Sequence, residues 1–530
     1  MTTRDPNRAR PTGAGAIAYA LREAGVEIAF GLPGVHNLAL WPAFEAAGIR
    51  IVGSRHEQGC AYAADGYARA TGKLGVALVT TGPGAANTLG AVGEAWASKS
   101  PVVLIATDIP SSQRIEGVYK GVLHECTDQA GLFAPVTKVQ TRDLAEAIGV
   151  ALQPSPGPAY FEVPTDRLVE TQSRPTNTTT IDDQRSSSIV SRSAPRLERP
   201  LIWVGGGAKD AGAQIDTLAR RLGAPVMTTY SARGVLPSGH PHLVPAPPHE
   251  PQVTDLIRQA GSTVVIGSDL DAMNTMAWKL PLPAPRIAIN VDATDATKNY
   301  EMDAVLTHDV AELDGWTSQF ETREPWFPDL AALGKGVRDE LRADPDTAES
   351  IEFLEQSESA LHAHGDPIVF ADMCIAGYWL AGHLAVHRRR GLHYPMGWGT
   401  LGWAFPASIG AAAAGQPSVA FMGDGGMLFA LGELATVAQE QLPLTIVVAD
   451  DGGYGMLRHP HDRALGCELS PVDFVAVAEG FGVPAKRVDG VGTDYGAALS
   501  AALDSNQPHL LHLRSRLYPP RTTSPRWPIR

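Results

Sequence analysis

The sequence predicts an α/β protein with three doubly wound parallel-sheet domains. Apolar runs typical of buried strands alternate with helical spacing in three segments of the chain, and such alternation implies parallel sheets. The length of 530 residues suits two to four domains of usual size. The chain is 44% hydrophobic and 19% charged, which is typical of a globular protein.

We expect the domains at residues 10–172, 190–327 and 350–516. A stretch rich in Ser, Thr, Pro and Arg, 172–200, predicts a linker between the first two. The strand candidates outside the third domain are 76–81, 102–107, 160–163, 201–204, 264–267 and 287–291.

Composition excludes several classes of function. The net charge of −14 argues against non-specific binding of nucleic acid. No apolar run reaches the ~18 residues of a membrane-spanning helix, and the polar first eleven residues do not resemble a secretory signal. The four cysteines are far apart without a CxxC pair, so we expect reduced thiols and a cytoplasmic protein.

The most informative motif is Gly423-Asp424-Gly425, followed 27 positions later by Asp451 (451 − 424 = 27). Residues 418–422 predict a buried strand, 427–441 a helix, and 442–449 a second strand. Each acid therefore follows a strand, and the carboxyl ends of parallel strands face one crevice. Two carboxylates beside glycine amides suit a Mg²⁺ ion that holds a diphosphate.

This spacing resembles the diphosphate–Mg²⁺ motif of thiamine diphosphate enzymes, the superfamily of acetolactate synthase, benzaldehyde lyase and pyruvate decarboxylase. The resemblance implies pyrimidine-binding, central and diphosphate-binding domains in that order. It implies Asp424, Asp451 and the backbone carbonyl of Gly453 as metal ligands. The cofactor-binding residues that it implies around them are Gly423, Gly425, Gly426, Tyr454 and Gly455.

Glu57 is the expected catalytic acid. It follows a short strand at 51–53 and precedes a helix of small residues that Gly72 closes. The run resembles the family signature "HE…A…GYAR.TG", in which the Glu binds N1′ of the cofactor's aminopyrimidine. That hydrogen bond favours the imino tautomer, whose 4′-nitrogen can take the C2 proton. Without the resemblance, an acid that favours a helix N-terminus would explain Glu57.

Two glycine turns resemble loops that shape the family's reaction pocket. Phe30-Gly31-Leu32-Pro33-Gly34 is the first, and Gly82-Pro83-Gly84 with Asn87 is the second. By this resemblance Pro33 and Asn87 contact the cofactor. The substrate contacts expected from the same region are His36, Thr80, Thr81 and His124. Tight structural turns and a surface histidine remain the alternatives.

The stretch Gly397 to Ala407 resembles the family's "G-bulky-G-x-x-x-P-A" segment. The bulky residue, which bends the cofactor so that its 4′-nitrogen approaches C2, falls on Leu401. The carbonyl of Gly399 and the amide of Leu401 would then hold the pyrimidine edge. A core leucine is the alternative.

In this family the Glu and the diphosphate clamp come from different subunits. The resemblance therefore implies a homo-oligomer, a dimer or a tetramer, whose active site is shared between subunits. The central domain has a glycine turn, Val204 to Gly212, that lacks the G-x-G-x-x-G spacing because Asp210 stands at the last glycine. We therefore expect no bound FAD.

The reaction is predicted from what surrounds His124. Pyruvate-type decarboxylases carry a His-His pair after a Leu, whereas Leu123-His124-Glu125 has one histidine. We therefore expect a carboligase similar to acetolactate synthase, which decarboxylates a 2-oxo acid and ligates the resulting enamine to a second carbonyl. His124 and Glu125 would handle substrate protons. The alternatives are a 2-oxo acid decarboxylase, a 2-hydroxyketone lyase, a FAD- or NAD-dependent oxidoreductase, and a cofactor-binding protein without catalysis.

Overall fold

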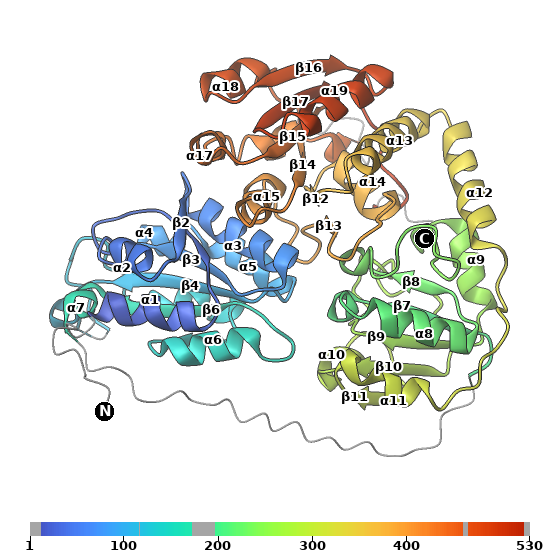
Figure 1. The fold of residues 1–530 in the computed structure, drawn as a ribbon, viewed down its shortest axis with the longest axis horizontal. Helices are drawn as coiled ribbons and strands as arrows, with labels where there is room; N and C mark the ends of the chain where they lie inside the picture. The colour runs from blue at the N-terminus through green and yellow to red at the C-terminus, as the bar shows by residue number, and fades with distance from the viewer. Residues whose placement is uncertain (1–11, 116, 172–196, 459–464, 524–530) are drawn as a thin grey trace, which may run out of the picture. The chain divides into compact units, whose positions relative to one another are not determined.

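The computed structural model describes residues 12–115, 117–171, 197–458 and 465–523. The chain forms two compact units: the first is Met1–Gln184 with Ile409–Gly415 and Ala435–Glu440, and the second is the remainder. Three parallel sheets with helices confirm the predicted fold class (Figure 1). Within the described ranges, every helix is too short or too polar to cross a membrane. The predicted domain edges at 10, 172 and 190, and most of the predicted linker, lie outside the described residues.

The first unit is built on a six-stranded sheet with the order β2-β1-β3-β4-β6-β5, all parallel. Its strands are β1 Ile28–Gly31, β2 Arg50–Gly53, β3 Gly75–Val79, β4 Val102–Asp108, β5 Gln140–Thr141 and β6 Ala159–Pro164. Its helices are α1 Gly13–Glu23, α2 Leu40–Ala46, α3 Glu57–Thr71, α4 Pro83–Ala86, α5 Leu89–Ala97, α6 Leu144–Leu152 and α7 Thr165–Val169. Helices α3 and α5 cover one face, and α1 and α6 cover the other (Figure 1).

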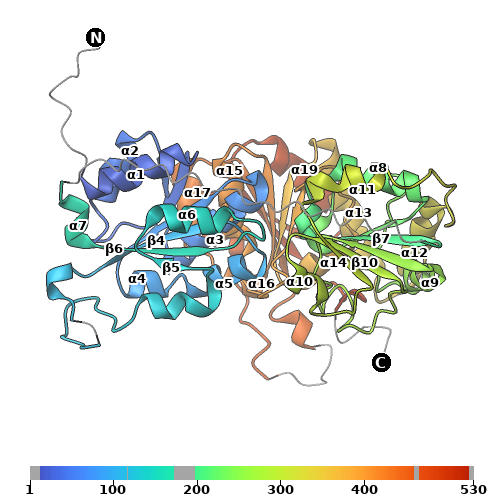
Figure 2. The same ribbon diagram turned by 90° about the horizontal axis from the view of Figure 1, so that it is seen from below.

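The second sheet, in the second unit, has the order β11-β10-β9-β7-β8. Its strands are β7 Pro200–Val204, β8 Val226–Thr228, β9 Ser262–Ile266, β10 Arg286–Asn290 and β11 Ala304–Thr307. The helices around it are α8 Gly212–Leu222, α9 Pro251–Gln259, α10 Ala293–Thr297 and α11 Leu313–Thr317. Ile202 and Val204 pack with α8 and α11, whereas Leu201 and Trp203 pack with α9, so alternate residues face opposite layers (Figure 2).

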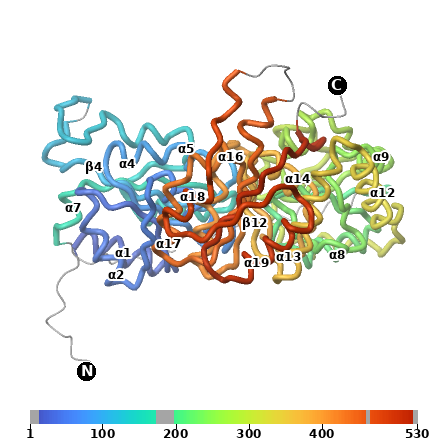
Figure 3. The backbone as a smooth tube through the Cα atoms, turned by 90° about the horizontal axis from the view of Figure 1, so that it is seen from above, coloured from blue at the N-terminus to red at the C-terminus, as the bar shows by residue number. Residues whose placement is uncertain are grey.

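The third sheet has the order β13-β12-β14-β15-β17-β16. Its strands are β12 Ile368–Ala371, β13 Leu392–His393, β14 Ser418–Gly423, β15 Leu444–Asp450, β16 Ala485–Asp489 and β17 His509–Arg514. The helices before and around it are α12 Leu330–Ala343, α13 Ala348–Ala363, α14 Ile375–His383, α15 Ala404–Ala413, α16 Asp424–Met427, α17 Glu433–Glu440, α18 Phe474–Gly480 and α19 Thr493–Asp504. Helices α13 and α19 lie side by side (Figure 3). One continuous apolar core joins the second and third sheets.

The predicted helix over 427–441 is wrong in its first third. Helix α16 ends at Met427 and α17 begins at Glu433, with turns over 428–432. The break lets the chain pass over the turn at Gly402, where an added Cβ would lie 2.7 Å from Cβ of Phe429. A tertiary contact therefore overrides the local helical spacing.

Candidate functional site

Glu57 is the first residue of α3, directly beyond the end of β2. The imidazole of His56 caps this helix by accepting a hydrogen bond of 3.1 Å from the amide of Gln58. At the other end Gly72 adopts φ +75° and stops the helix, as the sequence predicts. The Glu57 carboxylate is therefore held at a helix start on the edge where parallel strands end.

One oxygen of the Glu57 carboxylate accepts a hydrogen bond. Nδ2 of Asn87 donates a hydrogen bond of 3.0 Å to Oε2. Oε1 lies 3.5 Å from the position that a Cβ at Gly84 would take, and Thr80 borders the same point. The predicted residues Glu57, Thr80 and Asn87 are thus brought together.

The first glycine turn packs against the same place. Gly34 lies so close to Thr80 that an added Cβ would be 2.6 Å from the threonine Cβ. Buried Asn37 stabilises the turn, because its Oδ1 accepts from the Gly34 amide at 2.8 Å and its Nδ2 donates to the Leu32 carbonyl at 2.9 Å. Pro33, the predicted cofactor contact in this turn, is exposed.

His36 and His124 form a pair that the sequence did not reveal. Their rings are 5.4 Å apart and nearly perpendicular. Nδ1 of His36 lies 2.7 Å from Oγ1 of Thr81, which lies 2.9 Å from Oγ1 of Thr107. Burial, with the neighbouring His124, lowers the pKa of His36 despite the opposing charge of Asp108, and so favours the uncharged ring.

Gly82 makes the approach of His124 possible. Gly82 has φ +62°, and the backbone carbonyl of His124, itself at φ +68°, leaves no room for a Cβ there. Nδ1 of His124 and Oγ1 of Thr80 are buried without a hydrogen-bond partner among the described residues. Buried polar atoms without a partner fit a site that receives a polar ligand.

Sequence reasoning missed Gln129, which is buried below these turns. Its Oε1 accepts from the Gly82 amide at 2.5 Å, and its Nε2 donates to the Thr107 carbonyl at 3.0 Å and to the Tyr160 hydroxyl at 2.7 Å. No motif marks such a residue, because its role depends on contacts between distant loops.

Glu125 does not join the histidine pair by any contact that the structure records. Its Oε2 accepts hydrogen bonds of 3.0 Å from the amides of Lys120 and Val122 and so closes a turn. Its other oxygen is buried and lacks a partner within the described part of the chain. The predicted catalytic role of Glu125 stays a prediction.

We use the name Glu57 half-site for the residues Pro33, His36, Glu57, Thr80, Thr81, Asn87 and His124. A second group, the Asp424 half-site around Leu401, Asp424, Asp451 and Gly453, belongs to the other unit.

In the Asp424 half-site, β14 and β15 are neighbours with Gly423 opposite Ala449, so Asp424 and Asp451 follow adjacent strand ends. Asp424 is only 6% exposed. Burial, and next the charge of Asp451, raises the pKa of Asp424 to about 7. A divalent cation bound between the two carboxylates would offset the cost of ionising them, and carboxylate oxygens suit such a hard ion.

Arg458 partly balances this charge. Its Nη1 donates hydrogen bonds of 3.1 Å to Oδ1 and to the backbone carbonyl of Asp451, while Nε lies 2.7 Å from Glu468. Burial still raises the pKa of Asp451, with Arg458 opposing the shift.

Both acids line a cavity of about 220 Å³. Its walls include the predicted residues Leu401, Gly423, Asp424, Gly425, Gly426, Asp451, Gly453, Tyr454 and Gly455. Gly425 receives the ring of Tyr454, 2.6 Å from where a Cβ would be. Ile375 and Ala376 of the first turn of α14 also line the cavity, and the start of a helix favours an anion. No sequence motif marks this helix start.

Leu401 lies in a turn that Asp372 anchors. Asp372 follows β12, is fully buried, and accepts hydrogen bonds from the amides of Gly402 at 2.9 Å, Trp403 at 2.9 Å and Ala404 at 3.2 Å. Burial raises the pKa of Asp372 to about 6 although these amides oppose the shift. Gly399 and Gly402 on either side of Leu401 have φ of +76° and +78°. The predicted bulky residue is therefore presented by a specifically shaped turn.

The glycine turn of the central domain packs internally. A Cβ at Gly205 or Gly207 would run into the chain at Gly267. Asp210, which occupies the place of the last fingerprint glycine, accepts a hydrogen bond of 2.9 Å from Nε of Arg390. These contacts explain the glycines by close packing, and the absence of FAD stays a prediction.

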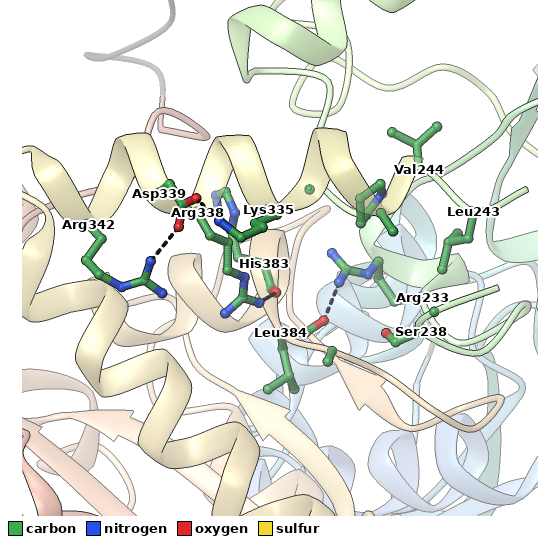
Figure 4. Close-up of a pocket in the computed structure, with 15 residues that line it drawn as sticks. Arg233, Ser238, Leu243, Val244, Lys335, Arg338, Asp339, Arg342, His383 and Leu384 are labelled. Carbon is green, nitrogen blue, oxygen red and sulfur yellow. Dashed lines mark hydrogen bonds and ion pairs between the residues drawn. The ribbon is translucent and has the colours of Figure 1, made fainter. Parts of the chain in front are cut away.

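A larger cavity of about 480 Å³ lies between α12 and the end of α14 (Figure 4). Its cations are already engaged: Lys335 and Arg342 with Asp339, and Arg338 with Glu358. Arg233 donates to the carbonyls of Ala381, Gly382 and Leu384 at the end of α14, and burial lowers its pKa to about 10. The charged side chains that line this cavity are thus occupied in ion pairs and hydrogen bonds that hold α12 and α14 together.

Three family models match the chain. They are the N-terminal TPP binding domain of thiamine pyrophosphate enzymes at residues 11–132, the central domain at 196–313, and the C-terminal TPP binding domain at 372–513.

Relatives match over most of the chain. It is 30% identical to the probable 2-ketoarginine decarboxylase AruI of Pseudomonas aeruginosa over 507 residues, 90% of this chain and 89% of the relative. It is 29% identical to the large subunit of acetolactate synthase isozyme 2 of Escherichia coli K12, over 94% of this chain and 95% of the relative. The solved structure of the thiamine diphosphate-dependent 4-hydroxybenzoylformate decarboxylase of Rhodococcus jostii RHA1 has a similar fold, with a TM-score of 0.78, 22% identity, and coverage of 96% of this chain and 99% of that one.

Proposed function

We propose, since this chain belongs to the thiamine pyrophosphate enzyme family, that it uses thiamine diphosphate and Mg²⁺ to decarboxylate a 2-oxo acid and releases the product after protonation. The observation that carries the proposal is the pairing of His36 with His124 beside Thr81. The chain lacks two consecutive histidines, yet the fold brings two imidazoles together from segments 88 positions apart (124 − 36 = 88).

The Asp424 half-site is the proposed cofactor anchor. Asp424, Asp451 and the Gly453 carbonyl would hold Mg²⁺, since carboxylate and carbonyl oxygens suit this ion. The amides of Gly425 and of the first turn of α14 would hold the diphosphate, while Gly399 and Leu401 would hold and bend the rest of the cofactor. When bound, thiamine diphosphate supplies the electron sink that allows a 2-oxo acid to lose CO₂.

Glu57 is proposed to hold a proton on N1′ of the aminopyrimidine. Its Oε2 is tied to Asn87, whereas Oε1 has no recorded hydrogen bond, so one oxygen is fixed and the other is available. A carboxyl group oriented in this way can share its proton with one ring nitrogen.

His36 and His124 are proposed to carry the proton that replaces CO₂ on the product carbon. A neutral imidazole can accept a proton on one nitrogen and donate from the other. Thr81 orients His36, and the unpaired Nδ1 of His124 remains open to a substrate or a water molecule. The carboxylate leaves as CO₂ and the carbon receives one proton, so an aldehyde is released.

Carboligation, which the sequence analysis favoured, is the second candidate. Its support is the similarity to acetolactate synthases. In this case the enamine carbon would bond to a second carbonyl carbon instead of a proton, and the product would be a 2-hydroxyketone or a 2-hydroxy-3-oxo acid. The two candidates differ in what the enamine carbon bonds to and therefore in product.

A homodimer is the proposed minimum assembly, because the resemblance to thiamine diphosphate enzymes implies an active site shared between subunits. Large apolar side chains are exposed near each in the sequence, with Val35 80%, Leu123 74% and Phe429 59% exposed. A shared interface would bury such side chains. All four cysteines are free, which is compatible with the proposed cytoplasmic location.

The test is incubation of the protein with thiamine diphosphate, Mg²⁺ and a panel of 2-oxo acids, with and without added aldehydes, followed by mass detection of products. The panel contains pyruvate, benzoylformate, 4-hydroxybenzoylformate and 2-ketoarginine. We expect CO₂ and free aldehyde. His124→Gln should slow aldehyde release by roughly 10²-fold or more, the usual contribution of a proton-transfer group.

His308→Gln is the matched control, because His308 pairs with Glu312 in the central domain. Hydroxyketone as the sole product would establish the carboligase instead. Unchanged aldehyde release in both His36→Gln and His124→Gln would refute the role of the pair.

A further inference from the structure

Three metal-ligating side chains meet outside both half-sites. His362 lies in the last turn of α13, Asp366 lies between α13 and β12, and His387 lies in the link from α14 to β13. One ligand atom from each lies within 4.8 Å of the others. The rings of His362 and His387 are 4.8 Å apart.

His362 and Asp366 contact each other directly, at a distance that a shared cation could also span. Nδ1 of His362 lies 3.3 Å from both Oδ1 and Oδ2 of Asp366. A charge-assisted hydrogen bond is usually ~2.7–2.9 Å long. Two ligands of a tetrahedral ion with bonds of ~2.0–2.1 Å stand ~3.3–3.4 Å apart, which is the separation observed.

The backbone holds the three ligands in place. The amide of Asp366 donates a hydrogen bond of 3.0 Å to the Leu361 carbonyl, which fixes Asp366 just beyond the helix. His387 directly follows Val386, whose amide donates to Oγ of Ser238 at 2.8 Å and whose carbonyl accepts from the Ser238 amide at 2.9 Å. The imidazole of His362 is 68% exposed, so its side-chain torsions can close the remaining gap.

The local charge also favours a cation. The carbonyls at the end of α13 give this place a partial negative charge, and Asp366 adds a full one. The arginines that follow His387 have other partners: Arg388 donates to Gln416, Arg390 pairs with Asp210, and the exposed Arg389 lies 3.9 Å from Asp210.

We propose that His362, Asp366 and His387 bind one Zn²⁺ ion, with water as the fourth ligand. Two imidazoles and one carboxylate are a zinc-type donor set, whereas Mg²⁺ prefers oxygen ligands alone. The bound ion joins the α13–β12 connection to the α14–β13 connection. The role of the ion is structural, because neither cavity described above includes these three side chains. It stabilises the edge of the third sheet.

The experiment uses the full-length chain without an affinity tag, loaded with thiamine diphosphate and Mg²⁺ so that Asp424 and Asp451 are engaged. Zn²⁺ is added by equilibrium dialysis, and bound metal is counted by elemental analysis beside thermal unfolding. We expect one Zn²⁺ per chain and a higher midpoint of unfolding. His362→Ala and His387→Ala should each weaken binding by roughly 10- to 100-fold or more, because even an indirect partner of a metal ligand commands that range.

His364→Ala is the control at the same helix end. Nδ1 of His364 is bonded to the Ala360 carbonyl at 2.6 Å and its Nε2 lies 3.1 Å from Asp504, so this variant should bind Zn²⁺ as the unaltered chain does. Asp366→Asn keeps the shape of the side chain and should also lose affinity for Zn²⁺. This variant serves as the test if the histidine variants do not fold. Equal zinc binding by the unaltered chain and by the double histidine variant would overturn the proposal. Because the readout is binding and not turnover, the outcome does not depend on the proposed reaction.

Discussion

The side-chain amide of Asn87 lies 3.0 Å from Oε2 of Glu57 and donates a hydrogen bond to it across 30 positions of sequence. The contact fixes the carboxylate at the start of α3 and leaves Oε1 beside Gly84. A residue expected to contact the cofactor is therefore also the immediate support of the expected acid.

The first prediction concerns Glu57→Gln. We expect turnover to fall by roughly 10²- to 10⁴-fold, because the amide cannot share an acidic proton with the cofactor. Binding of thiamine diphosphate, followed by fluorescence quenching, should persist, since its diphosphate anchor is elsewhere. Glu45→Gln, an exposed change on α2, is the control. Full turnover in Glu57→Gln would remove this residue from the mechanism.

The second prediction concerns Asp372→Asn. Asparagine offers one acceptor where three backbone amides converge, so the turn that carries Leu401 should loosen at a cost of about 1.5–3 kcal/mol. A lower midpoint of thermal unfolding and weaker binding of thiamine diphosphate are the expected readouts. Asp473→Asn is a matched control, because Asp473 caps α18 at an exposed position. Equal losses in both variants would mean that Asp372 contributes no more than an ordinary helix cap.

The third prediction concerns Arg458→Gln. Arg458 pairs with Asp451 at 3.1 Å and so competes with a cation for this carboxylate. Its removal should lower the Mg²⁺ concentration needed for half-maximal activity by roughly two- to fivefold, the equivalent of ~0.5–1 kcal/mol for a partly exposed pair. Arg487→Gln, which breaks an exposed pair with Asp489, should leave the Mg²⁺ requirement unchanged. A higher requirement in Arg458→Gln would contradict the competition.

The fourth prediction concerns acid stability. Burial lowers the pKa of His249 from about 6.5 to about 4, although its bond to the Met273 carbonyl opposes the shift. Between pH 6.5 and 4 the imidazole of His249 therefore binds a proton in the unfolded chain but not in the folded chain. Stability is fully present above pH 6.5 and falls by roughly 1.4 kcal/mol per pH unit below it.

Thermal unfolding at pH 7 and pH 5 tests this sign. His249→Gln keeps a donor for Met273 and cannot titrate, so the difference between the two midpoints should shrink. His308→Gln, whose imidazole is partly exposed, should not change it. An unchanged difference in His249→Gln would assign the acid sensitivity to other groups.

Local pattern was sufficient for much of the fold and for the chemistry at strand ends. Glu57, Asp424 and Asp451 each follow an apolar strand at the predicted place, because a carboxylate after a buried run marks a sheet edge in any parallel fold. The helix expected over 427–441 was wrong at 428–432, where the packing of Phe429 on Gly402 prevails over helical spacing.

Contacts between distant segments could not be predicted from one sequence. The pairing of His36 with His124, the cap that Asp372 places on the Leu401 turn, and the support of Gly82 by Gln129 all join residues far apart in the chain. A single histidine or glutamine in a loop carries no signal of its partner. The expectation of a carboligase relied in part on the absence of two consecutive histidines, and that absence does not reveal whether two histidines meet in space.

Gly82 and Gly402 both combine a positive φ with a neighbour that excludes any side chain, which is the His124 carbonyl at Gly82 and Cβ of Phe429 at Gly402. A survey of every single substitution would therefore score these two positions as harshly as Glu57 or Asp424, although neither bears a reactive group. Sensitivity to substitution at such sites reflects the lack of space for a side chain. Steric effects of this kind have to be separated from catalytic effects before the sensitive positions are taken as active-site residues.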